Sequence, residues 1–361
     1  MGLETDERGD PARRRPSLKY RLVRSSLLGA VGLVVVYAVM MAVVGSAGLV
    51  EALAGLNPSL LILPLISTLL SYITMSFSYE AIARLAGSSI RSLDMLRITF
   101  VANAANYIFP TGGLSGFALR IVMLNKRGVS AGRSVLISFT QTLITNFMLM
   151  AFVAYGLVHL MATRELRTGG VVAACLVVVG VVVLVGGAIL MMYRRSLRNR
   201  FLGWCDRCSS RVLDTLGKRE SHGRRVSRVL VHVNEGMEFL ASQPLGMVVP
   251  IFWIFLDWLL TLGILYAAFF SVGYPVSVSQ VAVGFSVSLV VAIMSLVPAG
   301  VGVLEATMAA TFLTVGVPLK VSVLPIVIFR ICYYVIPVIM ALVLAPRAFA
   351  DAEGSVGELM T

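Results

Sequence analysis

Charged side chains occur at four places inside otherwise apolar stretches of the sequence: Arg120, Asp257, Glu305 and Arg330. An ionised group is costly in hydrocarbon, so residues of this kind usually pair with one another or mark a pathway through the protein. From the sequence we favour the pairing of Arg120 with Glu305. Because the planar guanidinium of arginine suits phosphate oxygens, the four residues predict either an anion-binding site or a set of structural ion pairs.

Two glycine–proline breaks interrupt apolar segments near these charges. The first is Phe109-Pro110-Thr111-Gly112-Gly113, and the second is Val297-Pro298-Ala299-Gly300. A Gly-Val dipeptide follows each proline after the same interval, at Gly128 and at Gly316. The matching order and spacing predict an internal repeat, in which each copy consists of two short helices joined by unwound backbone.

Unwound backbone is tolerated at membrane depth only inside the protein or along a wet cavity. The helix that follows each break would then present free N–H groups, and helix N-termini favour anions. Paired breaks in copies of opposite orientation are typical of secondary transporters, where they indicate the substrate site. The alternative is structural, because proline kinks and closely packed glycines are common in membrane helices.

The amino-acid composition indicates that these breaks lie in a membrane protein. Hydrophobic residues make up 58% of the 361 residues and charged residues 13%, which is too apolar for a soluble domain. The sequence therefore predicts an all-α, polytopic membrane protein with about six full transmembrane helices plus two re-entrant helical hairpins in an inverted-repeat arrangement. The predicted spans are 27–44, 60–79, 135–159, 171–193, 247–272 and 321–344, and the predicted hairpins are 96–124 and 281–313.

The Lys and Arg residues are distributed unevenly around these segments. With the N-terminus in the cytoplasm, 25 of the 30 fall in cytoplasmic segments and three in external ones. This is the bias of the positive-inside rule, so both termini are predicted to be cytoplasmic. If the two broken segments crossed the membrane completely, there would be eight spans, and the basic residues around the first break would fall on opposite faces.

The chain is expected to divide into two membrane halves and three cytoplasmic segments, of which the N-terminal tail and the central loop are basic. Apolar residues at helical spacing in the central loop predict amphipathic helices on the anionic inner surface of the membrane; a solvated helical hairpin against the protein is the alternative. The predicted segments are a tail at 1–26, a first membrane half at 27–193, a loop at 194–244, a second membrane half at 245–346 and a tail at 347–361.

Several other functions are disfavoured by what the sequence contains. Cys205 and Cys208 form a C-x-x-C pair without further ligands at zinc-site spacing, so no metal site is predicted. No phosphate-binding G-x-x-x-x-G-K loop is present, and the spans hold no nucleophile–base pair, so we expect neither a cofactor nor an enzyme. The net charge of +12 belongs beside membrane segments, which favours anionic lipids over nucleic acid as partners.

The motifs around the breaks resemble those of a known family. The pattern comprises Asn106, Pro110, Gly112, Gly113, Gly116 and Arg120, then Pro298, Gly300, Gly302 and Glu305, then Arg330, Tyr333 and Pro337. It is similar, over about residues 20–347, to the flippase-like membrane family that includes the transmembrane region of lysylphosphatidylglycerol synthase, the multiple peptide resistance factor. The resemblance implies a multi-pass protein of a prokaryotic inner membrane and lipid translocation as its activity.

Two departures from the family pattern bear on the substrate. Members often carry a Glu-Arg pair where this sequence has Thr140-Gln141, so a charged contact is expected to be lost. Only fourteen residues follow Arg347, too few for the soluble aminoacyl-transferase domain of the family. Lipid aminoacylation is therefore not expected.

The function that these observations favour is a flippase or transport facilitator for a phosphate-bearing, anionic lipid. Arg120 and Arg330 would attract the headgroup, while Glu305 and Asp257 would orient them or bind a cationic group. The alternatives are an ion-coupled transporter of a small polar solute, with Glu305 or Asp257 as a proton site, and a membrane scaffold for a lipid-modifying enzyme; a homo-oligomer is also compatible. The expected substrate-binding residues are Asn106, Pro110, Gly112, Gly113, Gly116, Arg120, Asp257, Pro298, Gly300, Gly302, Glu305, Arg330 and Tyr333.

Overall fold

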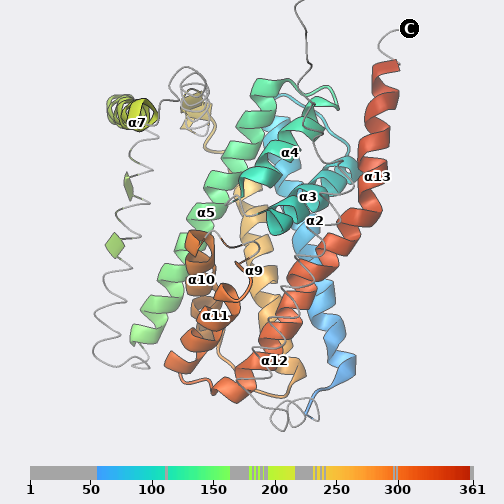
Figure 1. Ribbon diagram of the computed structural model, residues 1–361, viewed down its shortest axis with the longest axis vertical. Coiled ribbons are helices and arrows are strands. Elements are labelled where there is room, and N and C mark those ends of the chain that lie inside the picture. Colours follow the sequence, from blue (N-terminus) through green and yellow to red (C-terminus); the bar gives the residue numbers. More distant parts are fainter. Residues whose placement is uncertain are drawn as a thin grey trace, which may run out of the picture.

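The computed structural model describes residues 55–109, 113–162, 194–215, 241–295, 297 and 300–357, together with isolated residues between 179 and 190 and between 231 and 239. Every regular element in this part of the chain is a helix, and the helices form one elongated bundle beside which α7 stands apart (Figure 1). The prediction of an all-α fold is therefore confirmed.

Four helical segments are long and apolar enough to cross a membrane. They are η1 with α2 (Pro58–Leu61 and Ile62–Leu85), α5 (Ala131–Ala162), α9 (Val248–Ser271), and the continuous run of α12 (Leu319–Arg330), η3 (Ile331–Val335) and α13 (Ile336–Gly357). The shortest has 24 residues and is about 36 Å long, against about 30 Å of hydrocarbon. They match four of the six predicted spans, whereas 27–44 and most of 171–193 lie outside the described residues.

The α2 helix reverses the burial pattern of a soluble helix. Its hydroxyl residues face inward, including Ser71 and Ser78, which are both 0% exposed. Several of its large apolar residues face outward, among them Leu63, Ile66 and Leu70. Apolar side chains on the outside and polar ones on the inside fit a hydrocarbon environment rather than water.

Each broken segment folds as a helix, a break and a second helix that packs back on the first. The first comprises α3 (Ser92–Ile108) and α4 (Leu114–Asn125), and the second comprises α10 (Val278–Ser295) and α11 (Val303–Thr314). The two hairpins lie in opposite halves of the bundle, α3 and α4 in the upper half and α10 and α11 in the lower half of Figure 1. At 12 residues each, α4 and α11 are about 18 Å long, too short to cross the hydrocarbon alone.

The two ends of each hairpin are bonded to each other. Asp94 at the start of α3 pairs with Arg127 just after α4, at 3.6 Å. In the second hairpin, the side-chain amide of Gln280 in α10 donates to the carbonyl oxygen of Val315 at the end of α11, at 2.8 Å. Each hairpin therefore leaves the bundle at the end where it entered.

The two hairpins share the same backbone conformation at the positions that match in the sequence repeat. A glycine with positive φ immediately precedes each short second helix, Gly113 (φ 93°) before α4 and Gly302 (φ 81°) before α11. Another follows each helix, Gly128 (φ 80°) and Gly316 (φ 87°). Because side chains other than glycine rarely adopt this conformation, the four glycines fix the start and the end of both helices.

The turn after each second helix is closed in the same way in both copies. The N–H of Val129 donates to the carbonyl oxygen of Leu124 at 3.2 Å, and the N–H of Val317 donates to that of Phe312 at 2.9 Å. All four side chains are buried. These bonds satisfy carbonyl groups that the helix end would otherwise leave unpaired.

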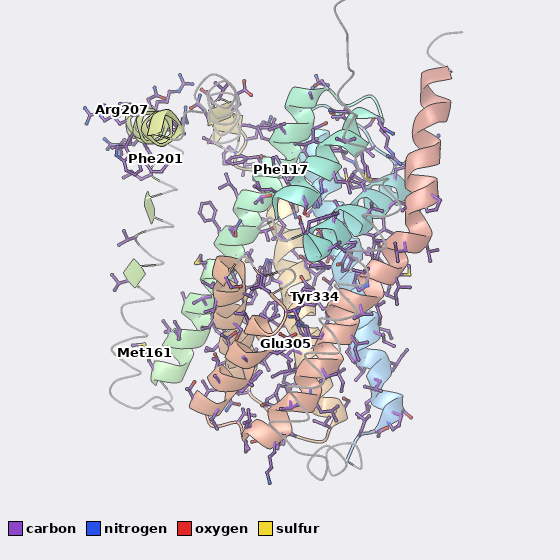
Figure 2. All side chains as sticks on the ribbon, viewed as in Figure 1. Phe117, Met161, Phe201, Arg207, Glu305 and Tyr334 are labelled. Atoms are coloured by element: carbon purple, nitrogen blue, oxygen red, sulfur yellow. The ribbon has the colours of Figure 1, made fainter. Side chains whose placement is uncertain are left out.

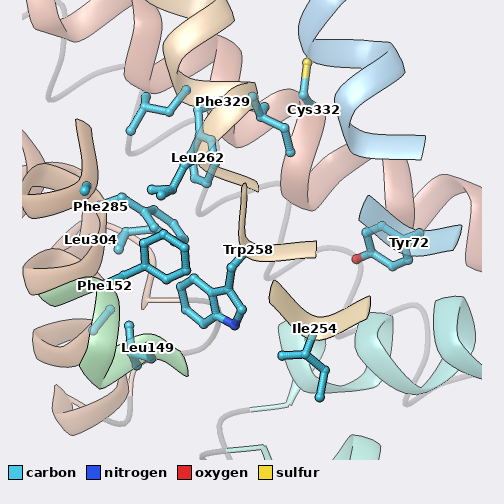
Figure 3. Close-up of a cluster of buried hydrophobic side chains, with 14 of the residues drawn as sticks. Tyr72, Leu149, Phe152, Ile254, Trp258, Leu262, Phe285, Leu304, Phe329 and Cys332 are labelled. Atoms are coloured by element: carbon cyan, nitrogen blue, oxygen red, sulfur yellow. The ribbon is translucent and has the colours of Figure 1, made fainter. Parts of the chain in front are cut away.

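A cluster of aromatic side chains ties the second hairpin to the spans (Figure 3). The ring centroid of Trp258 in α9 lies 5.8 Å from that of Phe152 in α5 and 5.9 Å from that of Phe285 in α10. Phe285 in turn meets Phe329 of α12 edge-on at 5.4 Å. Pairs of this kind contribute about 0.5–1.5 kcal/mol each beyond their buried area, so four helices share one packed core.

The α7 helix (Arg195–Thr215) covers the start of the basic loop. Its axis runs crosswise to the long axis of the bundle in Figure 1, and Phe201 and Arg207 lie on opposite sides of it in Figure 2. Its apolar residues Leu197, Phe201 and Trp204 are exposed. This is the amphipathic pattern of an interfacial helix, and its attachment to the membrane surface stays a prediction.

The close contact of α3 with α4 supports a stability prediction at Gly116. A methyl group on Gly116 would collide with the backbone carbonyl of Ala102 and the side chain of Asn106, whereas one on Gly132 in α5 would meet nothing. We expect Gly116→Ala to destabilise the protein by about 1–3 kcal/mol because neither neighbour can easily yield. Gly132→Ala should be neutral or stabilising by up to about 1 kcal/mol. Thermal unfolding in detergent measures both, and equal melting temperatures would contradict the packing described.

Candidate functional site

The second break is held by a buried ion pair. The carboxylate of Glu305 accepts a hydrogen bond from the N–H of Gly302, at 2.8 Å, and pairs with the guanidinium of Arg330. Arg330 also donates to the carbonyl oxygen of Gly300, at 3.1 Å. Glu305 and Arg330 are 7% and 5% exposed. The pair thus satisfies an N–H and a C=O of the unwound backbone, as the hydrocarbon environment requires.

The guanidinium of Arg330 also lies over the ring of Tyr334, 4.2 Å from its centroid. Figure 2 shows the labelled residues Glu305 and Tyr334 close together in the middle of the molecule.

The pairing of Arg120 with Glu305, favoured from the sequence, is wrong. Glu305 is paired with Arg330 because α12 packs directly against α11, whereas Arg120 belongs to the hairpin in the opposite half.

The first break is held by a neutral side chain in the corresponding role. The side-chain oxygen of Asn106 accepts from the N–H of Gly116, at 2.6 Å, and Ser115 donates to the carbonyl oxygen of Ala105 at 2.9 Å. The sequence predicted that the N–H groups after each break would be free for a substrate. At this break Asn106 occupies one of them, and at the other break Glu305 binds the N–H of Gly302.

Arg120 is buried without a carboxylate partner. It is 3% exposed, its guanidinium lies over the ring of Tyr79 at 4.0 Å, and it donates to the side-chain oxygen of Asn103 at 3.3 Å. Among the described residues no acidic side chain forms an ion pair with it, and its Nε has no hydrogen-bond partner. A cation–π contact and one neutral hydrogen bond leave most of its charge uncompensated, so among the buried arginines of the described residues Arg120 is the one whose charge is least balanced.

Asp257 lies at the interface of α9 with α2, apart from both breaks. It is 4% exposed and accepts from the hydroxyl of Ser71 at 2.5 Å, and Ser71 lies 3.2 Å from the hydroxyl of Thr261. In the described part of the chain no Lys or Arg pairs with it. The prediction that it would orient an arginine is therefore not met by the geometry.

Tyrosine side chains connect the two breaks. Tyr107 follows Asn106, and its ring centroid lies 4.6 Å from that of Tyr334 and 6.3 Å from that of Tyr333. Its hydroxyl oxygen lies 3.1 Å from that of Tyr72. Tyr333, a predicted site residue, therefore belongs to this tyrosine cluster. The other three were not predicted from the sequence, although Tyr107 adjoins a motif residue and Tyr334 follows Arg330 by one helical turn.

The remaining predicted site residues shape the breaks. Gly113, Gly300 and Gly302 adopt positive φ angles, and Gly116 lets α4 approach α3 closely. They act through backbone conformation and packing. Three others, Pro110, Gly112 and Pro298, lie outside the described residues.

The described interior of the bundle contains buried hydroxyl groups that lack a protein partner. Gln141 accepts from Ser78 at 2.9 Å, so the position where the family resemblance favoured a charged pair makes a neutral contact here. Buried polar groups at membrane depth need water or a ligand when the protein leaves them unpaired. In the described residues the buried hydroxyl groups without a hydrogen-bond partner include Ser76, Ser138, Thr140 and Ser286.

Comparison with known proteins agrees with the motifs. A family model described as the lysylphosphatidylglycerol synthase transmembrane region matches residues 27–341. The chain is also 21% identical over 332 residues to a UPF0104 membrane protein of Methanocaldococcus jannaschii, covering 90% of this chain and 94% of that protein. The alignment therefore extends over almost the whole length of that protein.

The ion pair at the second break generates a second prediction. Glu305→Gln or Arg330→Gln would leave one buried charge without its partner, which typically costs about 3–5 kcal/mol. The double variant should be less destabilised than the sum of the two, because no lone charge remains. Thermal unfolding in detergent measures this, with the exposed Arg195–Glu238 pair as control: Arg195→Gln should change stability by about 1 kcal/mol or less. Strictly additive single effects would contradict a direct pair.

Proposed function

The chain belongs to the lysylphosphatidylglycerol synthase transmembrane-region family, and on this premise we propose that it moves a phosphate-bearing lipid between the two membrane leaflets, with Arg120 as the headgroup contact. The observation that carries the proposal is the buried guanidinium of Arg120, which no carboxylate neutralises among the described residues. An isolated cation at such depth is costly, and a transient anionic ligand would offset that cost.

A phosphate group suits the donors of Arg120. Its Nε has no hydrogen-bond partner, and its forked donors match phosphate oxygens. The ring of Tyr79 holds one face of the guanidinium, and Asn103 fixes one nitrogen, so the remaining donors are oriented in advance. Arg330 is less suited to this role because its charge is already paired with Glu305.

A lipid is favoured over a small polar solute by an apolar groove between α5, α9 and α10. The groove has a volume of about 460 Å³. Its walls include Phe152, Tyr155, Phe255, Leu259 and Tyr266, and Tyr155, Phe255 and Tyr266 are exposed on the surface of the bundle. A concave apolar surface of this size open to the bilayer fits a hydrocarbon chain, whereas a polar solute would gain nothing from it.

The transport test compares labelled phosphatidylglycerol in proteoliposomes for wild type and Arg120→Gln. Losing a charge-assisted hydrogen bond costs about 1.5–3 kcal/mol, so the translocation rate should fall by about 10- to 100-fold. Arg133→Gln is the control, because Arg133 is exposed and bonds only to a loop carbonyl in the described part of the chain. Arg120→Lys should recover part of the rate, since it restores the charge without the fork.

Two further arms separate the alternatives. Labelled phosphatidylcholine tests whether the phosphate alone is sufficient, and entrapped glycerol phosphate tests transport of a solute. Wild-type vesicles that move no lipid faster than protein-free vesicles would reject the proposal. Movement of glycerol phosphate without lipid would favour the solute transporter, and neither activity would favour the scaffold.

We also propose that both hairpins are re-entrant, the first from the cytoplasm and the second from outside, in an inner membrane with cytoplasmic termini. The support is the short length of α4 and α11 and the bonds that join the two ends of each hairpin. The cytoplasmic assignment follows from the Lys and Arg bias of the sequence. Anionic lipids of the inner leaflet would then face the basic loop.

Single cysteines test this topology in a background without the four native ones. Ser89→Cys and Lys126→Cys flank the first hairpin, and Pro275→Cys and Lys320→Cys flank the second; all four positions are exposed. A membrane-impermeant maleimide should label the first pair only from the cytoplasm and the second pair only from outside. If either broken segment crossed completely, its two flanking cysteines would label from opposite sides.

A further inference from the structure

Asp257 and Glu305 are both buried carboxylates, but their surroundings differ. Glu305 is neutralised by Arg330. Within the described part of the chain, Asp257 receives only a hydroxyl hydrogen bond from Ser71, and Thr261 lies beside Ser71. A carboxylate at membrane depth that lacks a cationic partner must be compensated in another way.

We propose that Asp257 is a proton-binding site that couples proton movement to the movement of an anionic headgroup, an inference that rests on the proposed function. The carboxylate takes a proton from water on one side of the membrane and returns it to water on the other. Its partners are hydroxyl groups, which donate to the carboxylate or accept from the carboxylic acid. The same contacts therefore suit both protonation states.

The groups around Asp257 leave its charge unbalanced. Tyr72 and Tyr79 of α2 and Tyr333 of η3 lie within electrostatic range of it, and all three are neutral acids. No titratable side chain comes from η1 or α10 in the described residues. Among the side chains that the structure describes, the charged or titratable ones on the other helices packed against α9 are Glu80, Arg84, Arg133, Tyr155, Lys320, Arg330, Cys332 and Tyr334, and none of them forms an ion pair or hydrogen bond with Asp257.

Tyr79 provides a physical link between Asp257 and the proposed headgroup site. It lies beneath the guanidinium of Arg120 and within electrostatic range of Asp257. Protonation removes the negative charge of Asp257 and so raises the positive potential at Arg120. Anion binding and proton binding then favour each other, because coupling between two sites is reciprocal.

A stripe of hydroxyl groups makes the face of α2 beside Asp257 polar. Thr68, Ser71, Thr74 and Ser78 recur at intervals of three or four residues and are all buried, so they share one face of the helix. Ser71 reaches Asp257 and Ser78 reaches Gln141. This face passes Asp257 and continues toward the helix end that carries Tyr79.

The experiment uses proteoliposomes of the full chain with labelled phosphatidylglycerol and a pH gradient of either direction. In wild type, lipid should accumulate in the leaflet toward which protons flow, with roughly 5-fold or greater asymmetry if the coupling is of ordinary size. Asp257→Asn mimics the protonated state. It should still exchange lipid between leaflets but give the same distribution with and without the gradient.

Asp94→Asn is the matched control, because Asp94 is a carboxylate of the bundle that pairs with arginines at the hairpin end. It should keep the response to the gradient. A wild-type distribution that ignores the gradient, or an Asp257→Asn variant that still follows it, would overturn proton coupling while leaving lipid movement intact.

A second readout needs no transport and so separates this proposal from the proposed function. Infrared titration should show the carbonyl band of a buried carboxylic acid in wild type and in Asp94→Asn, and no such band in Asp257→Asn. If no protein variant moves lipid but this band titrates, lipid translocation fails and the proton site stands. If the band is the same in Asp257→Asn as in wild type, the proton site is rejected.

Discussion

The absence of water in hydrocarbon constrains the two breaks more than any other part of this protein. A helix satisfies its own backbone, but the unwound residues at each break cannot, and side chains must do so. At the first break the amide of Asn106 binds the N–H of Gly116. At the second, Glu305 and Arg330 bind an N–H and a carbonyl oxygen. The short helices α4 and α11 can begin where they do only because these side chains are present.

The same constraint separates the two buried arginines by role. Arg330 has a carboxylate, a carbonyl oxygen and an aromatic ring around it, which accounts for its charge and ties it to the fold. Arg120 has only a ring and a neutral amide among the described residues. Fold stability explains the first arrangement. It does not explain the second, because replacing an uncompensated buried cation by an apolar residue would ordinarily stabilise a protein. The proposed anionic ligand would compensate the charge of Arg120.

Much of this architecture could be predicted from the sequence, because it depends on local patterns. The length of apolar runs predicted four helices that the structure contains, and the spacing of Pro and Gly predicted two hairpins that begin and end within a few residues of the observed bounds. The partners of the charged residues could not be predicted in this way. Glu305 meets Arg330 because α11 and α12 are neighbours in space, and a single sequence does not show which helix faces meet. The tyrosine cluster was missed for the same reason, since its members come from α2, α3 and η3.

The tyrosine cluster lies between the side chains that hold the two breaks. The two hairpins themselves lie in opposite halves of the bundle (Figure 1). Tyr107 adjoins the residue that holds the first break, and Tyr334 covers the arginine that holds the second. Tyr334 belongs to η3, a single turn of π-helix, and such turns are frequent at functional sites because they interrupt the regular hydrogen-bond ladder. A displacement of Tyr107 with the first hairpin would therefore act on the least regular turn of the last span, one residue after Arg330.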